Sequence, residues 1–409
     1  MMCAECGSAL HHDILRMVCI DDQLRIRTVA ESKLYDLCAF NVENDTPDVI
    51  TEICTKVQSG IDLREGPLLK AALICGNSGD HLMLCAHHLV VDGISWRILL
   101  EDFSNLYKGH IQGVEVPLPS KTTSFKQWAE KMHEYAESNT VKSEISYWNE
   151  VSSKINSNFE YKYSAQNSDE SEIEVSLDKD ITQKLLYASS KAYSTDVTDL
   201  FLASLGLALE EYNGSVSTSV VLESHGRNSN IEDVIVDRTI GWFTCTYPVV
   251  FNNESDLKNM IIGVKDVVHR VPNDGFNYGI IRYIRNEINI AVQADICFNY
   301  LGNLDNDNNI DDIEISDELI GKTSSPDNAM QFKFYIDAFV SSKKMILRAT
   351  YKDSCFNSDD AEKLMKIYVD KIEKIVDHCT TAKEQIKTAT DFNKHLSNEA
   401  FREILDIFD

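Results

Sequence analysis

The pattern of apolar and polar residues predicts strands followed by amphipathic helices in the first third of the chain. Apolar runs at 68–74 and 81–86 flank an Asn-Ser-Gly-Asp turn at 77–80, which predicts a β-hairpin. Apolar residues then recur at helical spacing from Ile94 to Phe103, and we expect this helix to end near Gly109. A further amphipathic helix is expected from Phe125 onward.

The remainder of the chain also mixes strands with helices, so the pattern predicts an α/β or α+β fold. Strands are expected at 172–175, 216–222 and 238–249, and another that ends at 298–302. A hairpin is expected at 332–351, and helices at 195–213 and 364–376. At 409 residues the chain exceeds what one hydrophobic core usually serves. Residues 149–171 show little periodicity, so we predict an N-terminal lobe at 1–160 and a C-terminal lobe at 161–409.

Charge and cysteine usage narrow the function classes. The formal net charge of -26 argues against nucleic-acid binding and against binding to anionic membranes. The sequence contains neither a long apolar run nor a signal-peptide pattern, so a cytoplasmic protein with reduced thiols is expected. We expect no metal site, because the Cys3/Cys6 pair lacks a second pair and the acidic run at 305–316 lacks the glycine and glutamate of a calcium loop.

Candidate catalytic residues are concentrated in the connection between the strand at 81–86 and the helix that follows it. We interpret His88 as the better candidate for proton transfer, because it lies nearer the glycine turn, and His87 as held in packing. Asp92 can cap the helix and pair with a cation such as Arg227. Gly93 leaves a position without a side chain beside His88, where a substrate backbone could approach.

Glu223 is the second candidate for proton transfer. It ends an apolar strand, where burial can raise the pKa of a carboxyl toward neutrality, although a buried glutamate can also serve as an ion-pair partner. A second histidine pair, His11 and His12, has no base or glycine turn nearby and is interpreted as structural. No serine elbow, phosphate-binding loop or dinucleotide motif is present, so acid–base chemistry without a bound cofactor remains.

These residues carry a family resemblance. The stretch 87–93 resembles the HHxxxDG signature of the condensation-domain superfamily of nonribosomal peptide synthetases, and Ser95 and Trp96 are similar to its epimerization branch. Four further stretches, at 222–227, 237–248, 272–279 and 298–302, are similar to the same branch in order and spacing. The resemblance covers nearly the whole chain.

The resemblance implies two chloramphenicol-acetyltransferase-like lobes in a V shape with a central tunnel. A peptidyl carrier protein would insert phosphopantetheine bearing an aminoacyl or peptidyl thioester, and no cofactor would be bound directly. The reaction would be L-to-D epimerization at the α-carbon, with His88 and Glu223 on opposite sides of the substrate. The domain would be monomeric or part of a larger synthetase of antibiotic biosynthesis. Candidates for the tunnel wall are Ser95, Trp96, His225, Trp242, Tyr278, Asn299 and Tyr300.

Three departures from the family pattern are visible. The chain starts after the family's usual first strand and helix, so the first lobe is expected to be incomplete. Asn277 stands where the family usually has glycine, and Asn228 where an acidic residue is usual. Two alternatives stay open: a condensation domain that forms an amide bond, and a non-catalytic carrier-docking remnant. The context of Glu223 argues against condensation, and the presence of both His88 and Glu223 argues against loss of activity.

Overall fold

The computed structural model describes residues 2–77, 79–164, 169–227, 231–288, 293–304, 316, 318–325, 328, 330–393 and 401. By its own contacts the chain divides into two compact units. Unit 1 comprises Met1–Tyr135, His225–Thr244 and Asn306–Ser325, and unit 2 comprises Ala136–Ser224, Cys245–Asp305 and Pro326–Asp409. The predicted lobes, 1–160 and 161–409, are continuous in sequence, whereas these units interleave. Asn228, the acidic run at 305–312 and the side chains of Cys3 and Cys6 lie outside the described residues.

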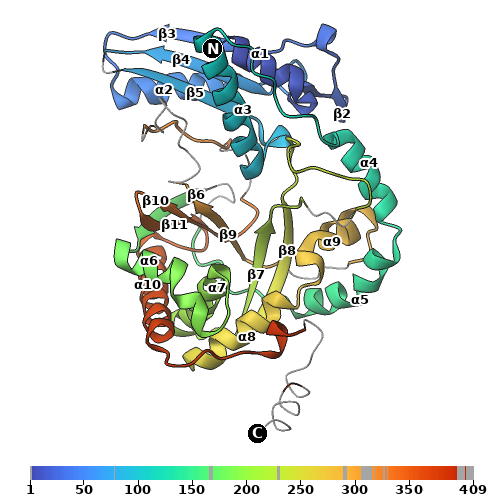
Figure 1. Ribbon diagram of the computed structural model, residues 1–409. Coiled ribbons are helices and arrows are strands. Elements are labelled where there is room, and N and C mark those ends of the chain that lie inside the picture. Colours follow the sequence, from blue (N-terminus) through green and yellow to red (C-terminus); the bar gives the residue numbers. More distant parts are fainter. Residues whose placement is uncertain are drawn as a thin grey trace. The chain divides into compact units, whose positions relative to one another are not determined.

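Unit 1 contains a small sheet covered by a helix (Figure 1). Strand β3 (Leu37–Asn41) is parallel to β4 (Leu69–Cys75), and β4 forms the predicted hairpin with β5 (Asp80–Ala86). Helix α2 (Pro47–Ser59) packs its apolar side against this sheet. An antiparallel ribbon, β1 (Met17–Ile20) and β2 (Gln23–Ile26), precedes it. The other elements are α1 (Met2–His11), η1 (Asp13–Arg16), η2 (Val29–Glu31), η3 (His88–Val90), α3 (Gly93–Gln112) and α4 (Phe125–Tyr135).

Helix α3 is longer than the sequence predicts. The expected stop at Gly109 is wrong, because this glycine stays helical and the helix continues to Gln112. A side chain at position 109 would collide with Val116, so the glycine is required by close packing. Gly113 ends the helix instead, in the left-handed conformation at φ 68° that glycine adopts without strain.

Unit 2 is built on a six-stranded sheet with the order β6-β11-β10-β9-β7-β8. Strand β9 is parallel to both β7 and β10, and the other neighbouring pairs are antiparallel. The predicted hairpin at 332–351 is confirmed as β10 and β11, joined after Ser341. The strands are β6 (Glu170–Ser176), β7 (Ser217–Ser224), β8 (Cys245–Asn252), β9 (Ile296–Asn303), β10 (Phe334–Ser341) and β11 (Lys344–Lys352).

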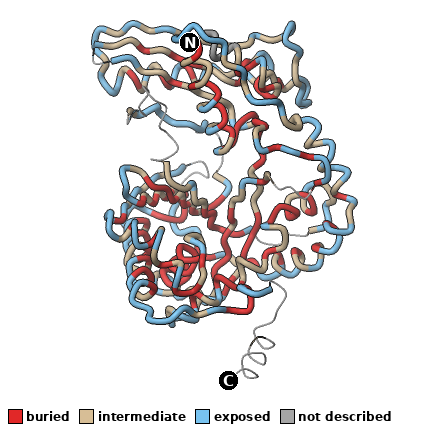
Figure 2. Tube along the Cα trace, viewed as in Figure 1, coloured by how far each residue is buried: buried red, intermediate tan, exposed pale blue. Residues whose placement is uncertain are grey.

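Helix α7 (Val197–Asn213) is the central helix of unit 2. Its side chains are buried from Asp199 to Leu209, and it packs against α8 and α10. It begins after Asp196 and ends at Gly214, as predicted. Figure 2 shows buried residues gathered in these helices and the strands beside them. The other elements are α5 (Asn139–Lys154), α6 (Lys179–Tyr187), η4 (Ser189–Ala192), α8 (Leu257–His269), η5 (Pro272–Gly275), α9 (Phe276–Gly279), η6 (Ile280–Ile284), α10 (Ser358–Thr381) and η7 (Ala389–Asp391).

Two predicted segments differ from the structure, while the mixed α/β class is confirmed. The strand predicted at 238–249 begins only at Cys245, because the backbone before it bonds to side chains of unit 1: Gly241 N–H donates to Ser95 Oγ and Phe243 N–H to Asp92. The connection expected at 149–171 starts late, because α5 continues to Lys154. None of the helices described is long and apolar enough to cross a membrane.

Candidate functional site

The two adjacent histidines of unit 1 have different surroundings. His87 N–H donates to Leu68 O at the end of the hairpin, and His87 Nδ1 accepts the N–H of Leu89 at 3.2 Å. In the neutral ring this contact leaves the proton on Nε2. Burial, and then the neighbouring His88, lowers the pKa of His87. His88 is exposed, and its ring lies 4.6 Å from the ring of Trp242.

Asp92 holds in place the connection between β5 and α3, residues 87–92, which we call the histidine loop. Its carboxylate is 3% exposed, and Oδ1 accepts the N–H of Ser95 at 2.7 Å, so it caps α3 as predicted. The predicted partner is also present, because Arg227 Nη2 lies 2.9 Å from the same oxygen. Oδ2 accepts the N–H of Phe243 at 3.1 Å. Both oxygens are therefore engaged in joining the loop to the segment 225–244 of the same unit.

The remaining unit 1 candidates fall into buried and exposed groups. Ser95 is fully buried, and its hydroxyl donates to Gly241 O at 2.9 Å. Trp96 is half-buried against the core beneath the loop. His225 is exposed and accepts the N–H of Arg227 at its Nδ1, and Trp242 is 45% exposed. A side chain at Gly93 would meet nothing within 4 Å, so space is open above this residue.

Glu223 lies near the end of β7 in unit 2 and accepts hydrogen bonds from neighbouring side chains, among them the Cys297 thiol at 4.0 Å. Tyr335 Oη donates to Oε1 at 2.7 Å, and Asn299 Nδ2 donates to Oε2 at 2.8 Å. The sequence pattern did not reveal Tyr335 as a partner. Its alternation with the buried Phe334 and Ile336 places Tyr335 on the opposite sheet face, which was the available signal.

Asp337 follows on the same face of β10 and is electrostatically linked to Glu223. Burial, and then the negative charge of Glu223, raises the pKa of Asp337 to about 7, while Arg348 opposes this shift. Burial also raises the pKa of the Tyr335 hydroxyl far above its usual range. Tyr335 therefore remains protonated and acts as a hydrogen-bond donor at physiological pH.

A cavity of about 410 Å³ in unit 2 gives access to Glu223. It is lined by Asp196, Thr198, Asp199, Leu222, Glu223, Ser224, Tyr247, Val268, His269, Asp274, Phe298 and Tyr300. Asp196, Asp199 and His269 place one ligand atom each within 4.8 Å of one another, a spacing that a metal ion could use. Their contacts already have a structural role: Asp199 accepts from His269 at 2.9 Å, raising the pKa of that histidine, and also from Asp196 N–H.

The short helices η5 and α9, at residues 272–279, are bonded to α5. Gly275 has φ 80°, and a side chain there would collide with the ring of Tyr247. Asn277, which departs from the family glycine, is fully buried and donates to Glu144 at 2.7 Å. Tyr278 is buried against Trp148, with ring centres 5.0 Å apart. The assignment of Tyr278 and the other tunnel candidates to a substrate path stays a prediction.

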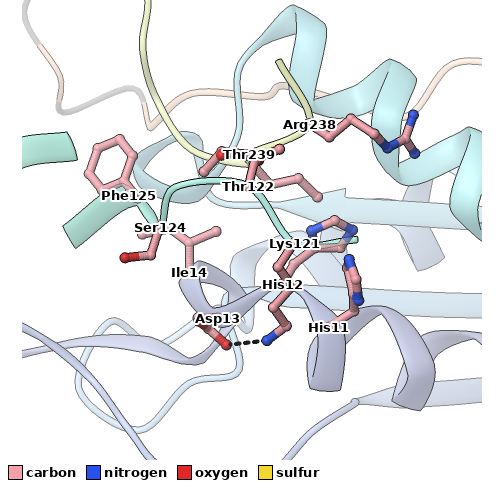
Figure 3. Close-up of a pocket in the computed structure, with 11 residues that line it drawn as sticks. His11, His12, Asp13, Ile14, Lys121, Thr122, Ser124, Phe125, Arg238 and Thr239 are labelled. Atoms are coloured by element: carbon pink, nitrogen blue, oxygen red, sulfur yellow. Dashed lines mark hydrogen bonds and ion pairs between the residues drawn. The ribbon is translucent and has the colours of Figure 1, made fainter. Parts of the chain in front are cut away.

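A small pocket beside His11 and His12 is surrounded by ion pairs that stabilise the fold (Figure 3). His12 Nε2 lies 2.8 Å from the buried Asp102, whose other oxygen is 2.6 Å from Arg238 Nη2. The cavity measures only about 40 Å³, which is room for a few water molecules. These contacts fit the interpretation of this histidine pair as part of the framework.

Comparison with known proteins shows the family to which the chain is similar. A model of the condensation-domain family matches residues 8–396. Bacitracin synthase 2 of Bacillus licheniformis is 32% identical over 412 residues, covering 98% of this chain and 16% of that protein. Gramicidin S synthase 1 of Brevibacillus brevis is 32% identical over 422 residues, covering 97% of this chain and 38% of that protein. The chain thus spans well under half the length of these relatives.

The chain is also similar to solved structures. The epimerization domain from the third module of tyrocidine synthetase B is 30% identical with a TM-score of 0.86, covering 94% of this chain and 89% of that chain. The condensation domain from the Monacolin K polyketide synthase has a TM-score of 0.70 at 16% identity, covering 92% of this chain and 88% of that chain, and this likeness concerns the fold alone.

Proposed function

Because the chain belongs to the condensation-domain family, we propose that it epimerizes the α-carbon of an aminoacyl or peptidyl thioester bound to a carrier protein. The observation that carries this proposal is the likeness to the tyrocidine synthetase epimerization domain, at 30% identity and TM-score 0.86 across most of both chains. The phosphopantetheine arm of the carrier would bring the substrate, in nonribosomal peptide synthesis. The reaction as proposed uses no cofactor bound by the domain itself.

Inversion of a stereocentre by proton transfer requires removal of a proton from one face and delivery to the other. We assign these two roles to Glu223 and His88, and the direction of turnover decides which of them is the base. The thioester makes the α-proton more acidic than that of an ester or an amide. The geometry of Glu223 supports this role, because it lines a cavity and both of its oxygens are oriented by neighbouring donors.

His87, Asp92, Gly93 and Arg227 are assigned supporting roles. The ion pair and the helix cap of Asp92 keep the backbone of the histidine loop in one conformation, and Arg227 is the cation that completes them. The lowered pKa of His87 keeps this ring neutral near pH 7, so it adds no positive charge beside His88. Gly93 leaves open space next to this proposed proton-transfer group.

The test incubates the protein with a panel of L-aminoacyl carrier-protein thioesters in heavy water. We expect α-deuterium incorporation and formation of the D-isomer, measured by mass spectrometry and chiral chromatography of the hydrolysed amino acid. The loaded carriers without the protein serve as controls. Amide formation with a second loaded carrier and unchanged chirality would establish condensation instead. Carrier binding without any reaction would establish a docking module.

A further inference from the structure

We infer that Tyr335 is a positioning residue for Glu223, holding its carboxylate in the orientation needed for proton transfer through the 2.7 Å hydrogen bond from Oη to Oε1. This inference rests on the proposed function of Glu223. Tyr335 belongs to β10, whereas Glu223 belongs to β7, and β9 lies between these two strands. The contact therefore reaches across a whole strand.

The strand register explains why a tyrosine can make this contact. Tyr335 is level with Cys297 on β9, which is level with Val221 on β7, two residues before Glu223. Two strand spacings amount to roughly 9.6 Å, so the donor must be a long side chain. Cys297 occupies the intermediate position, and its Sγ is 4.0 Å from Glu223 Oε1. A small side chain on β9 thus leaves room for the tyrosine ring.

Asn299 and Tyr335 donate to different oxygens of Glu223, and the Cys297 thiol donates to the same oxygen as Tyr335. Asn299 Nδ2 bonds Oε2 and Tyr335 Oη bonds Oε1, which together fix the plane of the carboxylate. An ionised carboxylate accepts hydrogen bonds at both of its oxygens. Hydrogen bonds to the ionised form also lower the affinity of a carboxylate for protons.

Other groups around Glu223 act in the opposite direction. Asp337 is close enough for its pKa to be raised by Glu223, and the same interaction raises the proton affinity of Glu223 once Asp337 is ionised. Tyr335 offsets this repulsion without itself losing a proton. Among the described residues, the titratable groups that face Glu223 or share its cavity are Asp196, Asp199, Cys245, Tyr247, His269, Asp274, Cys297, Tyr300, Tyr335 and Asp337.

The test compares Tyr335→Phe with Tyr351→Phe. Both changes remove one hydroxyl from the six-stranded sheet, but Tyr351 lies on β11 and serves as the control. Two quantities are measured on the intact chain: the pH profile of α-deuterium exchange on the loaded carrier, and the titration of Glu223 by NMR of protein labelled at the glutamate carboxyl carbon. For Tyr335→Phe we expect kcat to fall about ten- to hundredfold with little change in KM.

In the same variant Glu223 should titrate at a higher pH than in the wild type, and the corresponding limb of the rate profile should move in the same direction. Unchanged kcat together with an unchanged Glu223 titration would overturn the inference. A wild type without exchange would defeat the proposed function, yet the NMR titration would still decide whether Tyr335 controls Glu223. If Tyr335→Phe does not fold, 3-fluorotyrosine at position 335 provides a stronger donor, and Glu223 should then titrate at a lower pH; no movement would overturn the inference.

Discussion

The two proposed proton-transfer groups are held by different means. Glu223 lies on β7, between two neighbouring strands, and each of its oxygens accepts a hydrogen bond from another side chain. His88 lies in the short turn η3 after β5, an edge strand of its sheet, and its described contact is the ring of the half-exposed Trp242. Glu223 is therefore held in place through its side chain, whereas His88 is held in place through its backbone.

This difference determines how firmly each of the two side chains is oriented. Asp92 accepts hydrogen bonds from the backbone N–H groups of Ser95 and Phe243, which fixes the backbone of the histidine loop. These bonds do not involve the His88 ring. An aromatic contact leaves a ring more rotational freedom than two charge-assisted hydrogen bonds leave a carboxylate. We infer that the Glu223 carboxylate is held in its orientation more firmly than the His88 ring.

The largest expected effect comes from replacing the reacting groups themselves. Glu223→Gln and His88→Ala should each lower the rate of deuterium exchange about 10²- to 10⁴-fold, the usual contribution of general acid–base catalysis. Because His88 is exposed, added imidazole should restore part of the activity of His88→Ala. His110→Ala removes another exposed histidine of unit 1 and should match the wild type. If either Glu223→Gln or His88→Ala keeps full activity, the replaced residue takes no part in the mechanism.

A smaller effect is expected from breaking the support of the histidine loop. Asp92→Asn leaves the guanidinium of Arg227, whose side chain is 5% exposed, without its carboxylate. Loss of one partner of a buried pair usually costs about 3–5 kcal/mol, so the free energy of unfolding should fall by that amount. Urea denaturation and hydrogen exchange of the Ser95 and Phe243 amides measure this change. Glu130→Gln breaks an exposed pair with Lys126 and should shift stability by less than about 1 kcal/mol.

The smallest effect on stability is expected at Gly93. The space around it is open, so Gly93→Ala should change the free energy of unfolding by no more than about 0.5 kcal/mol. Activity should nevertheless drop several-fold if the substrate passes this residue, as proposed. Gly113→Ala is the opposite control, because its left-handed φ of 68° penalises alanine by about 1 kcal/mol while the site is unchanged. Wild-type activity of Gly93→Ala would remove the clearance role.

The sequence predicts best those features whose causes are local. Helix α7 follows from its capping residue Asp196, its apolar run and the glycine after it, and the hairpin of β10 and β11 follows from alternation on both sides of a polar turn. The pairing of Asp92 with a cation such as Arg227 is also predicted, because a buried carboxylate needs a cation.

Features set by distant partners could not be predicted. The segment before Cys245 looks like a strand, but its backbone is bound by Ser95, which is 146 residues from Gly241. Tyr335 lies in a strand that the alternation identifies, yet its contact with Glu223 depends on β9 being placed between β7 and β10. A pattern along one strand does not reveal the order of strands in a sheet.

The separation of Asp92 and Arg227 has a consequence for synthesis of the protein. Arg227 is 135 residues later in the chain. At 5–20 residues per second the ribosome needs roughly 7 to 27 seconds to supply it. During that interval the nascent first unit lacks the guanidinium of its buried ion pair, along with the rest of the segment 225–244. The core of unit 1 can be completed only after β7 of unit 2 has been translated. A stalled chain that ends before His225 would therefore expose an incomplete unit 1 to chaperones and proteases.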